Sequence, residues 1–331
     1  MKMTTLGQNG PATSQFGIGA MSFAGLYGDA TEAQSHAVLD ACFEAGVTHI
    51  DTANVYGMGR SEEIIGTWLA QHPGAREKLT IATKAGITRR DGVRLFDNSL
   101  AHMEEELDAS LKRLGTDHVD LFYAHRRDPD RPIEDIAGEM AQLIAKGKTR
   151  AIGFSEIAPS TLRRAASEHP VAAVQSEYSL STRSPELGLV QACAELGTTV
   201  VAFSPVGRSL LTDAPFDDAK IDSINFLKTN PRFKEPNLTA NLAANTAFRA
   251  LARDMGISAA GLAIAWLIAQ GDHVLPIPGT SSVTHLRELL EGATRRLTQE
   301  DLARIEATLP IGWCHGDRYN ADQWVGPERY C

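Results

Sequence analysis

The sequence predicts an α/β protein, a (β/α)8 TIM barrel, and three observations lead to this fold class. Eight short apolar runs alternate along the chain with segments whose apolar residues recur at helical spacing. The runs are almost continuously apolar, which is typical of strands in a parallel sheet that is covered on both faces. Eight such units within 331 residues favour a closed barrel over an open sheet, and we expect residues 1–331 to form a single domain.

The eight expected strands are short and rich in β-branched residues. In chain order they cover residues 16–20, 47–50, 79–84, 118–125, 150–155, 172–175, 198–204 and 274–277. Ahead of them, residues 4–13 predict an N-terminal β-hairpin with Asn9-Gly10 as its turn. Residues 206–240 are too long for an ordinary connection, and we expect them, with other long loops, to cover the C-terminal face of the barrel.

The expected helices carry start and stop signals at their ends. Thr31-Glu-Ala-Gln34 is a capping box ahead of an apolar stripe, and Gly46 ends that helix. Ser99 caps a second helix with a regular apolar face, which Gly115 ends. The other helices are expected at residues 61–71, 133–146, 159–168, 185–196, 258–270 and 283–290.

Composition and charge limit the classes of partner. With 43% apolar and 22% charged residues, the chain has the makeup of an ordinary globular protein. Its 32 basic and 41 acidic residues are spread along the chain, for a net charge of −9, and no basic stripe offers a nucleic-acid footprint. No apolar run is long enough to span a bilayer. We therefore expect neither a nucleic-acid partner nor a membrane partner.

The N-terminus and the cysteines indicate a reduced, cytoplasmic protein. The first ten residues contain no apolar stretch of the length found in signal peptides. The cysteines, Cys42, Cys193, Cys314 and Cys331, lie far apart, and no Cys-x-x-Cys or Cys/His cluster suggests zinc. The sequence therefore predicts free thiols and no metal site.

Polar residues lie at the ends of three successive strands. Asp51 follows the second expected strand, Lys84 ends the third and His125 ends the fourth, while Tyr56 lies on the loop after the second. In a parallel barrel the C-terminal ends of the strands form the active-site face. Taken singly, each residue has a simpler explanation, such as a helix cap, a surface lysine or a buried histidine. Their shared position on one rim favours catalysis.

Longer motifs around these residues make the chain resemble an aldo-keto reductase over essentially its whole length. The motifs are Asp51–Gly57, Thr83-Lys84, His125–Pro129, Gly153–Ser155, Gln175–Ser179, Phe203–Gly207 and Ile277–Thr280. A microbial and plant branch that reduces assorted aldehydes and ketones is similar at Asn230–Phe233, Ser155-Glu156 and Gly316–Tyr319. The resemblance implies reversible reduction of an aldehyde or ketone to an alcohol, with a catalytic tetrad of Asp51, Tyr56, Lys84 and His125.

The chemistry of carbonyl reduction explains the roles of these four residues. A hydride must reach carbon and a proton must reach oxygen, but a phenol with a pKa of about 10 is a poor proton relay at neutral pH. The ammonium group of Lys84 would stabilise the phenolate of Tyr56, and Asp51 would keep Lys84 charged. We therefore expect Tyr56 to be the general acid and Lys84 and Asp51 to lower its pKa. We expect His125 to orient the carbonyl.

Because no side chain supplies a hydride, a cofactor must supply it, and the resemblance implies that this cofactor is a nicotinamide dinucleotide. The missing Gly-x-Gly-x-x-Gly motif argues against a Rossmann domain. Barrels instead bind phosphate groups through the loops after strands seven and eight and a helix N-terminus. The cofactor-binding candidates there are Ser204, Pro205, Val206, Gly207, Arg208, Gly279, Thr280, Ser281, Ser282, His285 and Glu288. A helix that is merely capped by serine is the simpler alternative for the second loop.

The resemblance also implies how the nicotinamide is held and which cofactor is used. Ser155 and Gln175 would hold its amide group, and Tyr178 or a nearby ring would stack on it. The expected cofactor is NADP(H), with NAD(H) left open. Two other functions also stay open, a Schiff-base lyase that uses Lys84 as its nucleophile and a regulatory subunit that binds the cofactor but turns over little.

The expected partner is a small carbonyl or alcohol substrate that binds at the barrel mouth. In such enzymes the loops there determine the substrate, and here they are residues 23–29, 89–98, part of 206–240 and the C-terminal tail. The aromatic candidates for lining the substrate site are Tyr27, Phe96, Trp313 and Trp324. The identity of the substrate, the preferred direction and the oligomeric state do not follow from the sequence.

Overall fold

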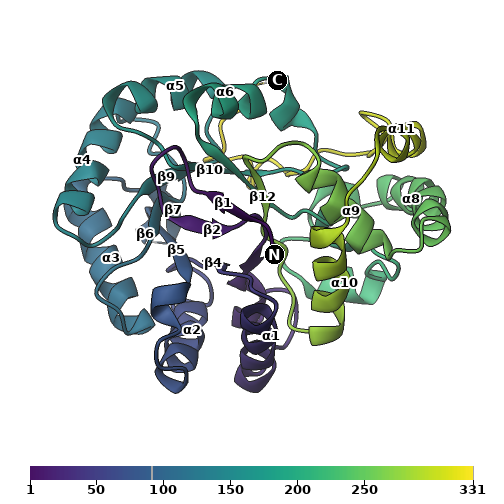
Figure 1. Ribbon diagram of the computed structural model, residues 1–331. Coiled ribbons are helices and arrows are strands. Elements are labelled where there is room, and N and C mark those ends of the chain that lie inside the picture. Colours follow the sequence, from purple (N-terminus) through teal and green to yellow (C-terminus); the bar gives the residue numbers. More distant parts are fainter. Residues whose placement is uncertain (91, 331) are drawn as a thin grey trace.

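The computed structural model describes residues 1–90 and 92–330 and is built around eight parallel strands. Neighbouring strands pair in chain order, and the N–H of Gly19 donates to the carbonyl oxygen of Pro278 at 2.8 Å, so the first and last strands meet. The sheet is a nearly closed barrel, which confirms the predicted fold class (Figure 1). The strands are β3 (Gly17–Gly19), β4 (His49–Asp51), β5 (Thr80–Ala85), β8 (Leu121–Ala124), β9 (Ile152–Ser155), β10 (Ala173–Glu177), β11 (Thr199–Phe203) and β12 (Val274–Pro276).

Helices surround the barrel, as Figure 1 shows. Those between or after the barrel strands are α1 (Glu32–Glu44), α2 (Arg60–Gln71), α3 (Leu100–Leu114), α4 (Ile133–Ala145), α5 (Pro159–Glu168), α6 (Leu189–Leu196), α9 (Ala259–Ile268) and α10 (Val283–Thr294). Three more, α7 (Asp218–Ser223), α8 (Asn237–Asp254) and α11 (Gln299–Thr308), lie in the segment after β11 and near the C-terminus. In the described part of the chain, no single helix is long and apolar enough to cross a membrane, although the bent pair α8 and α9 suffices by length and composition alone.

The local capping signals act as the sequence predicts. Thr31 and Gln34 form the capping box at the start of α1. Ser99 accepts a hydrogen bond at the start of α3, which ends at Gly115 in the left-handed conformation, with φ of 67°. The helix expected at 185–196 is shorter, because Gly188, with φ of 132°, separates a 3₁₀ turn at Ser184–Leu187 from α6.

The N-terminal hairpin closes one end of the barrel. Strands β1 (Met3–Thr5) and β2 (Ala12–Ser14) pair antiparallel, as predicted. The expected tight turn at Asn9-Gly10 is wrong, since the connection runs from Leu6 to Pro11 and is closed by a 3.0 Å hydrogen bond between these two residues. The wider loop lets Leu6 become wholly buried with the side chains inside the barrel.

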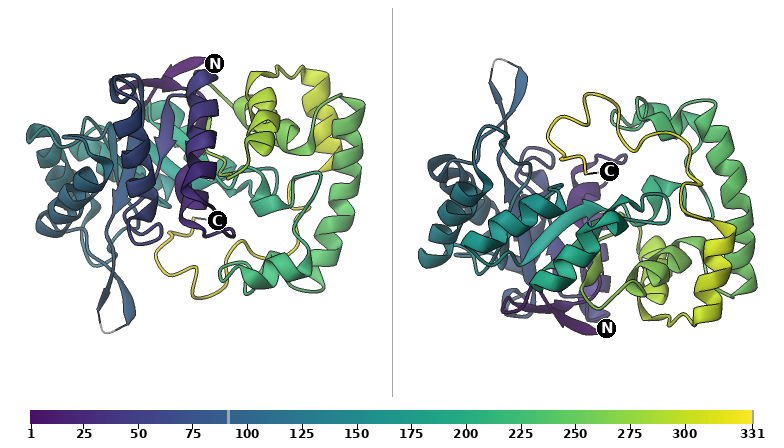
Figure 2. Two further views of the ribbon diagram at one scale, coloured as in Figure 1. Left: turned by 90° about the horizontal axis from the view of Figure 1, so that it is seen from below. Right: turned by 90° about the horizontal axis from the view of Figure 1, so that it is seen from above.

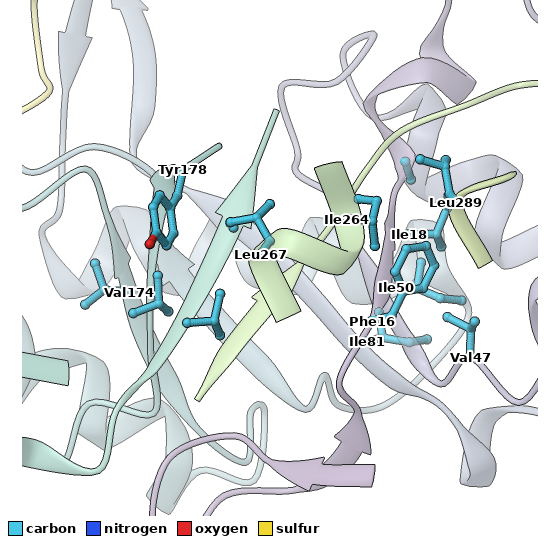
Figure 3. Packing of buried hydrophobic residues seen from close by; sticks show 14 of the residues in the cluster. Phe16, Ile18, Val47, Ile50, Ile81, Val174, Tyr178, Ile264, Leu267 and Leu289 are labelled. Atoms are coloured by element: carbon cyan, nitrogen blue, oxygen red, sulfur yellow. The ribbon is translucent and has the colours of Figure 1, made fainter. Parts of the chain in front are cut away.

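Most of the core lies between the sheet and the helices. Figure 3 shows Ile18, Ile50 and Ile81, from three neighbouring strands, packed together and wholly or almost wholly buried. A smaller cluster fills the barrel interior and includes Leu121 and Tyr123. This packing fixes the strands and therefore the residues at their ends.

Three segments extend beyond the C-terminal ends of the strands. Residues 206–240 contain α7, 3₁₀ turns at Gly207–Ser209 and Pro231–Phe233 and the start of α8. Residues 89–98, expected as a loop, belong largely to an antiparallel hairpin of β6 (Ile87–Arg90) and β7 (Val93–Phe96), and residue 91 lies outside the described residues. Both views in Figure 2 place this hairpin and the C-terminal tail at the end of the barrel opposite the N-terminus.

Candidate active site

A cavity of about 670 Å³ opens at the C-terminal ends of the strands, a volume typical of small-molecule sites. Three predicted site residues do not line it. Lys84 lies buried between Asp51 and Tyr56, Gly207 is buried in its loop, and Ser282 caps α10. The predicted residues that line the cavity are Asp51, Tyr56, His125, Ser155, Gln175, Ser204, Pro205, Val206, Arg208, Gly279, Thr280, Ser281, His285 and Glu288.

The four predicted tetrad residues lie together at one end of this cavity. Lys84 Nζ donates to Asp51 Oδ1 at 2.5 Å and to the carbonyl oxygen of Thr52 at 2.6 Å, and it lies 5.0 Å from the centre of the Tyr56 ring. Asp51 accepts a second hydrogen bond, at Oδ2, from Gln175 at 2.8 Å. The pairing of β4 with β5 places Asp51 and Lys84 on adjacent strands, so their side chains meet inside the barrel.

Burial dominates the acidity of Tyr56 and raises the pKa of its phenol above the ordinary value. Lys84 acts in the predicted direction, because its charge and hydrogen bond lower this pKa, but the charge of Asp51 raises it. The prediction that Lys84 and Asp51 together bring the pKa below its ordinary value is therefore wrong. A nearby carboxylate repels a phenolate, and a buried site disfavours any charge. At neutral pH the phenol keeps its proton.

Lys84 stays charged in this buried position. Burial alone would lower the pKa of Lys84, but the charges of Asp51 and Tyr56 raise it above its ordinary value. The ammonium group is therefore available to stabilise a phenolate when Tyr56 gives up its proton.

His125 faces the cavity as a neutral ring. Burial holds the pKa of His125 well below its usual value, and the charges of Arg126 and Lys84 lower it further. The ring meets that of Tyr56 edge to face, with 5.9 Å between centroids. A neutral imidazole can donate one N–H to a substrate oxygen beside the phenol without adding a second positive charge to the site.

The residues expected to hold the nicotinamide lie next to the tetrad, with one correction. Ser155 and Gln175 line the cavity from β9 and β10. Tyr178 does not, because its ring packs edge to face on Trp266 and its hydroxyl donates to Glu186 at 3.0 Å. Side chains alternate along an extended chain, so Tyr178 points toward the helices when Gln175 points into the cavity. Phe203, at the end of the neighbouring strand β11, is an aromatic residue that does line the cavity.

The loops expected to bind phosphate have an unusual backbone. Among the described residues, the non-glycine residues with positive φ are Met58, Glu156, Ser204, Arg208 and Ser209, and all lie in loops that follow barrel strands. Such conformations are costly and gather at functional sites. After β12, Ser282 accepts a hydrogen bond from the N–H of His285, so α10 begins beside the cavity. A helix N-terminus there attracts anions.

Five charged residues, four of them buried and one partly buried, form a second feature, which sequence reasoning missed. Arg208 donates to Glu177 at 2.8 Å, Arg318 donates to Glu156 at 2.5 Å, and Arg232 lies 3.4 Å from Glu177. We call these five residues the carboxylate–arginine cluster. The guanidinium group of Arg208 is thus paired with a carboxylate, although the residue lines the cavity as predicted. The signal in the sequence is that Glu156 and Glu177, like Asp51, lie at strand ends.

Of the four aromatic residues expected to line the substrate site, one lines the cavity. Tyr27 lines the cavity, whereas Phe96, Trp313 and Trp324 do not. Trp313 donates its indole N–H to the carbonyl oxygen of Leu180. The aromatic residues that line the cavity besides Tyr27, Tyr56 and Phe203 are Phe216, Phe226 and Tyr319. The last three lie in irregular segments, where periodicity gives no indication of side-chain direction.

The described residues contain no group of three or more His, Cys, Asp or Glu side chains placed to hold a metal ion. Cys42, Cys193 and Cys314 are free thiols, and Cys331 lies outside the described residues.

The chain is similar to known proteins over almost its entire length. A sequence profile of the Aldo/keto reductase family matches residues 15–310. "Probable aldo-keto reductase 1" of Glycine max is 38% identical over 316 residues, which cover 95% of this chain and 90% of that protein. An aldo-keto reductase of Schizosaccharomyces pombe, named with NADP(+), is 37% identical over 308 residues, covering 92% and 90%. The structure of a glycerol dehydrogenase from Gluconobacter oxydans matches with a TM-score of 0.80 and 28% identity, covering 93% of this chain and 94% of that one.

Proposed function

The chain belongs to the aldo/keto reductase family, and from this premise we propose that it is an NADPH-dependent enzyme that reduces an aldehyde or ketone to an alcohol. The observation that carries the proposal is the buried Lys84, which lies between Asp51 and Tyr56, two residues that line the cavity. A charged lysine held against a phenol has a clear use in proton transfer. We infer that the reaction takes place in the cytoplasm.

We assign one role to each residue of the tetrad. Tyr56 gives its proton to the carbonyl oxygen of the substrate, and Lys84 stabilises the phenolate that remains. Asp51 keeps Lys84 charged and in place, and Gln175 fixes Asp51 in turn. The neutral ring of His125 donates to the same carbonyl oxygen and orients it.

The cavity fits a dinucleotide cofactor, which supplies the hydride when bound. Ser155 and Gln175 would hold its amide group, and Phe203 offers a ring surface beside them. The loop at Ser204–Ser209, in which several residues have positive φ, and the N-terminus of α10 would hold its phosphates. These assignments, and the preference for NADPH over NADH, are part of the proposal.

The lyase alternative is less well supported. A Schiff base requires an uncharged amine that the substrate can reach. The pKa of Lys84 is instead raised by Asp51 and Tyr56, against the effect of its burial, and Lys84 does not line the cavity.

The test is the single-atom change Tyr56→Phe. We expect kcat for an aldehyde to fall by about 10²- to 10⁴-fold, the usual effect of a positioned proton donor. NADPH binding, measured by cofactor fluorescence, is expected to persist. As a control, Tyr178→Phe removes a buried hydroxyl outside the cavity, and we expect kcat to change by less than about threefold because the tetrad is untouched.

Three results would contradict the proposal. Activity in Tyr56→Phe equal to wild type would exclude Tyr56 as the proton donor. Wild-type protein that binds NADPH but reduces no aldehyde, ketone or sugar would point to a regulatory subunit. A substrate trapped on Lys84 by borohydride would favour the lyase.

A further inference from the structure

Two arginine side chains face the cavity at its catalytic end. Arg126 directly follows His125, and its charge acts on both Tyr56 and His125. Arg94 lies on β7, in the hairpin that extends on the same side of the barrel as the C-terminal tail (Figure 2). Both residues are half-buried and line the cavity.

The hydrogen bonds of these two arginines go to uncharged groups. Arg126 donates from Nη1 to the carbonyl oxygen of His125 at 2.7 Å and to the hydroxyl of Ser155 at 3.0 Å. Arg94 donates from Nη2 to the carbonyl oxygens of Asp322 and Val325 at 2.6 and 2.9 Å. In the described part of the chain, neither arginine forms an ion pair with a carboxylate. Arg208, which also lines the cavity, does form such a pair, with Glu177.

Three carboxylates at or near the cavity are already bound to other groups. Asp51 is paired with Lys84, Glu156 with Arg318, and Asp213 accepts a hydrogen bond from the N–H of Ala259 at the start of α9. The chain carries a net charge of −9, so acidic residues are plentiful, yet among the described residues none forms an ion pair with Arg94 or Arg126. The charge of Arg126 acts on Glu156, but that carboxylate is hydrogen-bonded to Arg318.

The two arginines also repel each other. Burial lowers the pKa of Arg94, the like charges of Arg126 and Arg89 lower it further, and the charge of Asp322 does not compensate. A bound anion would relieve this repulsion, because it would lie against both guanidinium groups.

We propose that the substrate carries an anionic group, a carboxylate or a phosphate, near its reacting carbonyl, and that Arg126 and Arg94 bind this group. The inference rests on the proposed function and specifies its substrate class. A guanidinium group forms two parallel hydrogen bonds with either anion, and Arg126 is adjacent in sequence to the residue that orients the carbonyl. The anion therefore binds a few bonds away from the carbonyl.

The experiment compares aldehydes that differ only in charge. The carboxylate arm sets 4-carboxybenzaldehyde against methyl 4-formylbenzoate, and the phosphate arm sets glyceraldehyde 3-phosphate against glyceraldehyde. We expect wild type to prefer the anion in at least one arm by about tenfold or more in kcat/KM, because charged hydrogen bonds have that strength. The arm that shows the preference identifies the anion.

The arginine variants then assign the preference to its residues. Arg126→Gln and Arg94→Gln are each expected to lower the ratio of kcat/KM for the anionic aldehyde to kcat/KM for the neutral aldehyde by about 10- to 100-fold, because the neutral aldehyde has no anionic group to lose its partner. Arg126→Lys keeps the charge but cannot form the two parallel hydrogen bonds of a guanidinium group, so we expect a smaller loss of the preference for the anionic aldehyde. Arg89→Gln is the matched control, since Arg89 is paired opposite Arg94 in the hairpin but does not line the cavity.

Anion binding gives a second readout that needs no turnover. Terephthalate has no carbonyl to reduce, and we expect it to raise the melting temperature of both wild type and Tyr56→Phe, because an anion that binds the native state stabilises it. The Kd from this shift should be about tenfold or more weaker in Arg126→Gln.

The outcomes separate this inference from the proposed function. Reduction of neutral aldehydes with no anion preference in either arm would overturn the inference and leave the function intact. Equal losses on neutral and anionic aldehydes in both variants would also overturn it, because the arginines would then be structural only. Anion binding without any aldehyde reduction would uphold the anion site and contradict the proposed function.

Discussion

Two groups of buried charges lie at the C-terminal face of this barrel, and they differ in how they are assembled. The Lys84–Asp51 pair comes from two adjacent strands and contacts Tyr56. The carboxylate–arginine cluster joins the ends of β9 and β10 to residues from 208, 232 and 318. The pair joins neighbouring strands of the sheet, and in the proposed function it supports proton transfer. The cluster joins segments that are far apart in the chain and holds the covering segments in place.

The contacts of Arg318 show what the cluster holds. Its guanidinium group lies 4.7 Å from the centre of the Tyr319 ring and 4.6 Å from that of Trp324. Tyr319 lines the cavity. Because buried ion pairs cost desolvation, they add little net stability but are very sensitive to loss of one partner. The cluster therefore makes the position of the tail specific rather than merely favourable.

The largest effect on stability is expected from Glu177→Gln. The side chain of Glu177 is 2% exposed and lies against Arg208 and Arg232, so a neutral amide would leave both guanidinium groups without this partner. We expect the free energy of unfolding to fall by about 3–5 kcal/mol, as is usual when one member of a buried pair is removed. Urea denaturation measures this change.

The matched control is Glu195→Gln, which breaks the pair with Arg163 on the surface. Those side chains are 61% and 47% exposed, and we expect a loss of less than about 1 kcal/mol. If Glu177→Gln and Glu195→Gln cost the same, the cluster has no structural importance beyond that of a surface pair, and the comparison drawn above fails.

The next largest effect on stability concerns His49, on which the charge of Lys84 acts. His49 is wholly buried, and no other described residue forms a hydrogen bond with its ring nitrogens. Burial, with the charge of Lys84, lowers the pKa of His49 to about 3. In the unfolded chain the pKa is about 6.5, so below that pH the unfolded state binds a proton that the folded state does not. The stabilisation is complete above about pH 6.5 and is lost as the pH falls toward about 3.

The low pKa of His49 predicts that the unfolding free energy falls as the pH falls, and that replacing His49 makes this fall less steep. Between pH 6 and pH 4 we expect His49 to contribute about 1.4 kcal/mol of stability loss per pH unit. His49→Gln removes the titrating group, so its unfolding free energy should depend less steeply on pH by up to that amount. His315→Gln, at an exposed site, is the control. Parallel curves for wild type and His49→Gln would show that His49 does not resist protonation in the folded state.

The sequence predicts the pair better than the cluster for a physical reason. Strand ends follow from local apolar runs, and adjacent parallel strands end at the same face, so Asp51, Lys84 and His125 could be placed together. Helix ends are equally local, as Ser99 and Gly115 of α3 show. Arg232 and Arg318 lie on irregular segments, and no periodic pattern specifies which distant carboxylate they meet.

Three expectations differ from the structure, each for its own physical reason. The net pKa of Tyr56 depends first on its burial, which no spacing of residues along a chain reveals. The resemblance implies that Tyr178 or a nearby ring stacks on the nicotinamide, but strand alternation turns Tyr178 toward the helices, where it packs on Trp266. The hairpin of β6 and β7 was expected as a loop, because its short strands lack a clear apolar alternation.

The smallest expected effect tests whether the cluster alone positions the tail. At the far end of the tail Glu328 accepts from Arg127 at 2.7 Å and from the N–H of Ala158 at 2.7 Å, and Tyr319 and Gln323 line the cavity between the two anchors. Glu328→Gln weakens this second anchor. Because both partners are partly exposed, we expect a stability loss of about 1 kcal/mol or less.

Its consequence for catalysis should be confined to substrate binding. We expect KM for the carbonyl substrate to rise by about threefold, with kcat and KM for NADPH unchanged. The side chain of Glu328 contacts neither the tetrad nor the phosphate loops, and Tyr319, whose ring lies 5.1 Å from the Arg208 guanidinium, is still held by Arg318. Steady-state kinetics with each substrate varied in turn measures this. A rise in KM equal to that of a variant of the carboxylate–arginine cluster would show that Glu328 and the cluster hold the tail equally. A fall in kcat would show that the tail also positions the tetrad. The distinction between the Lys84–Asp51 pair and the cluster would then no longer hold.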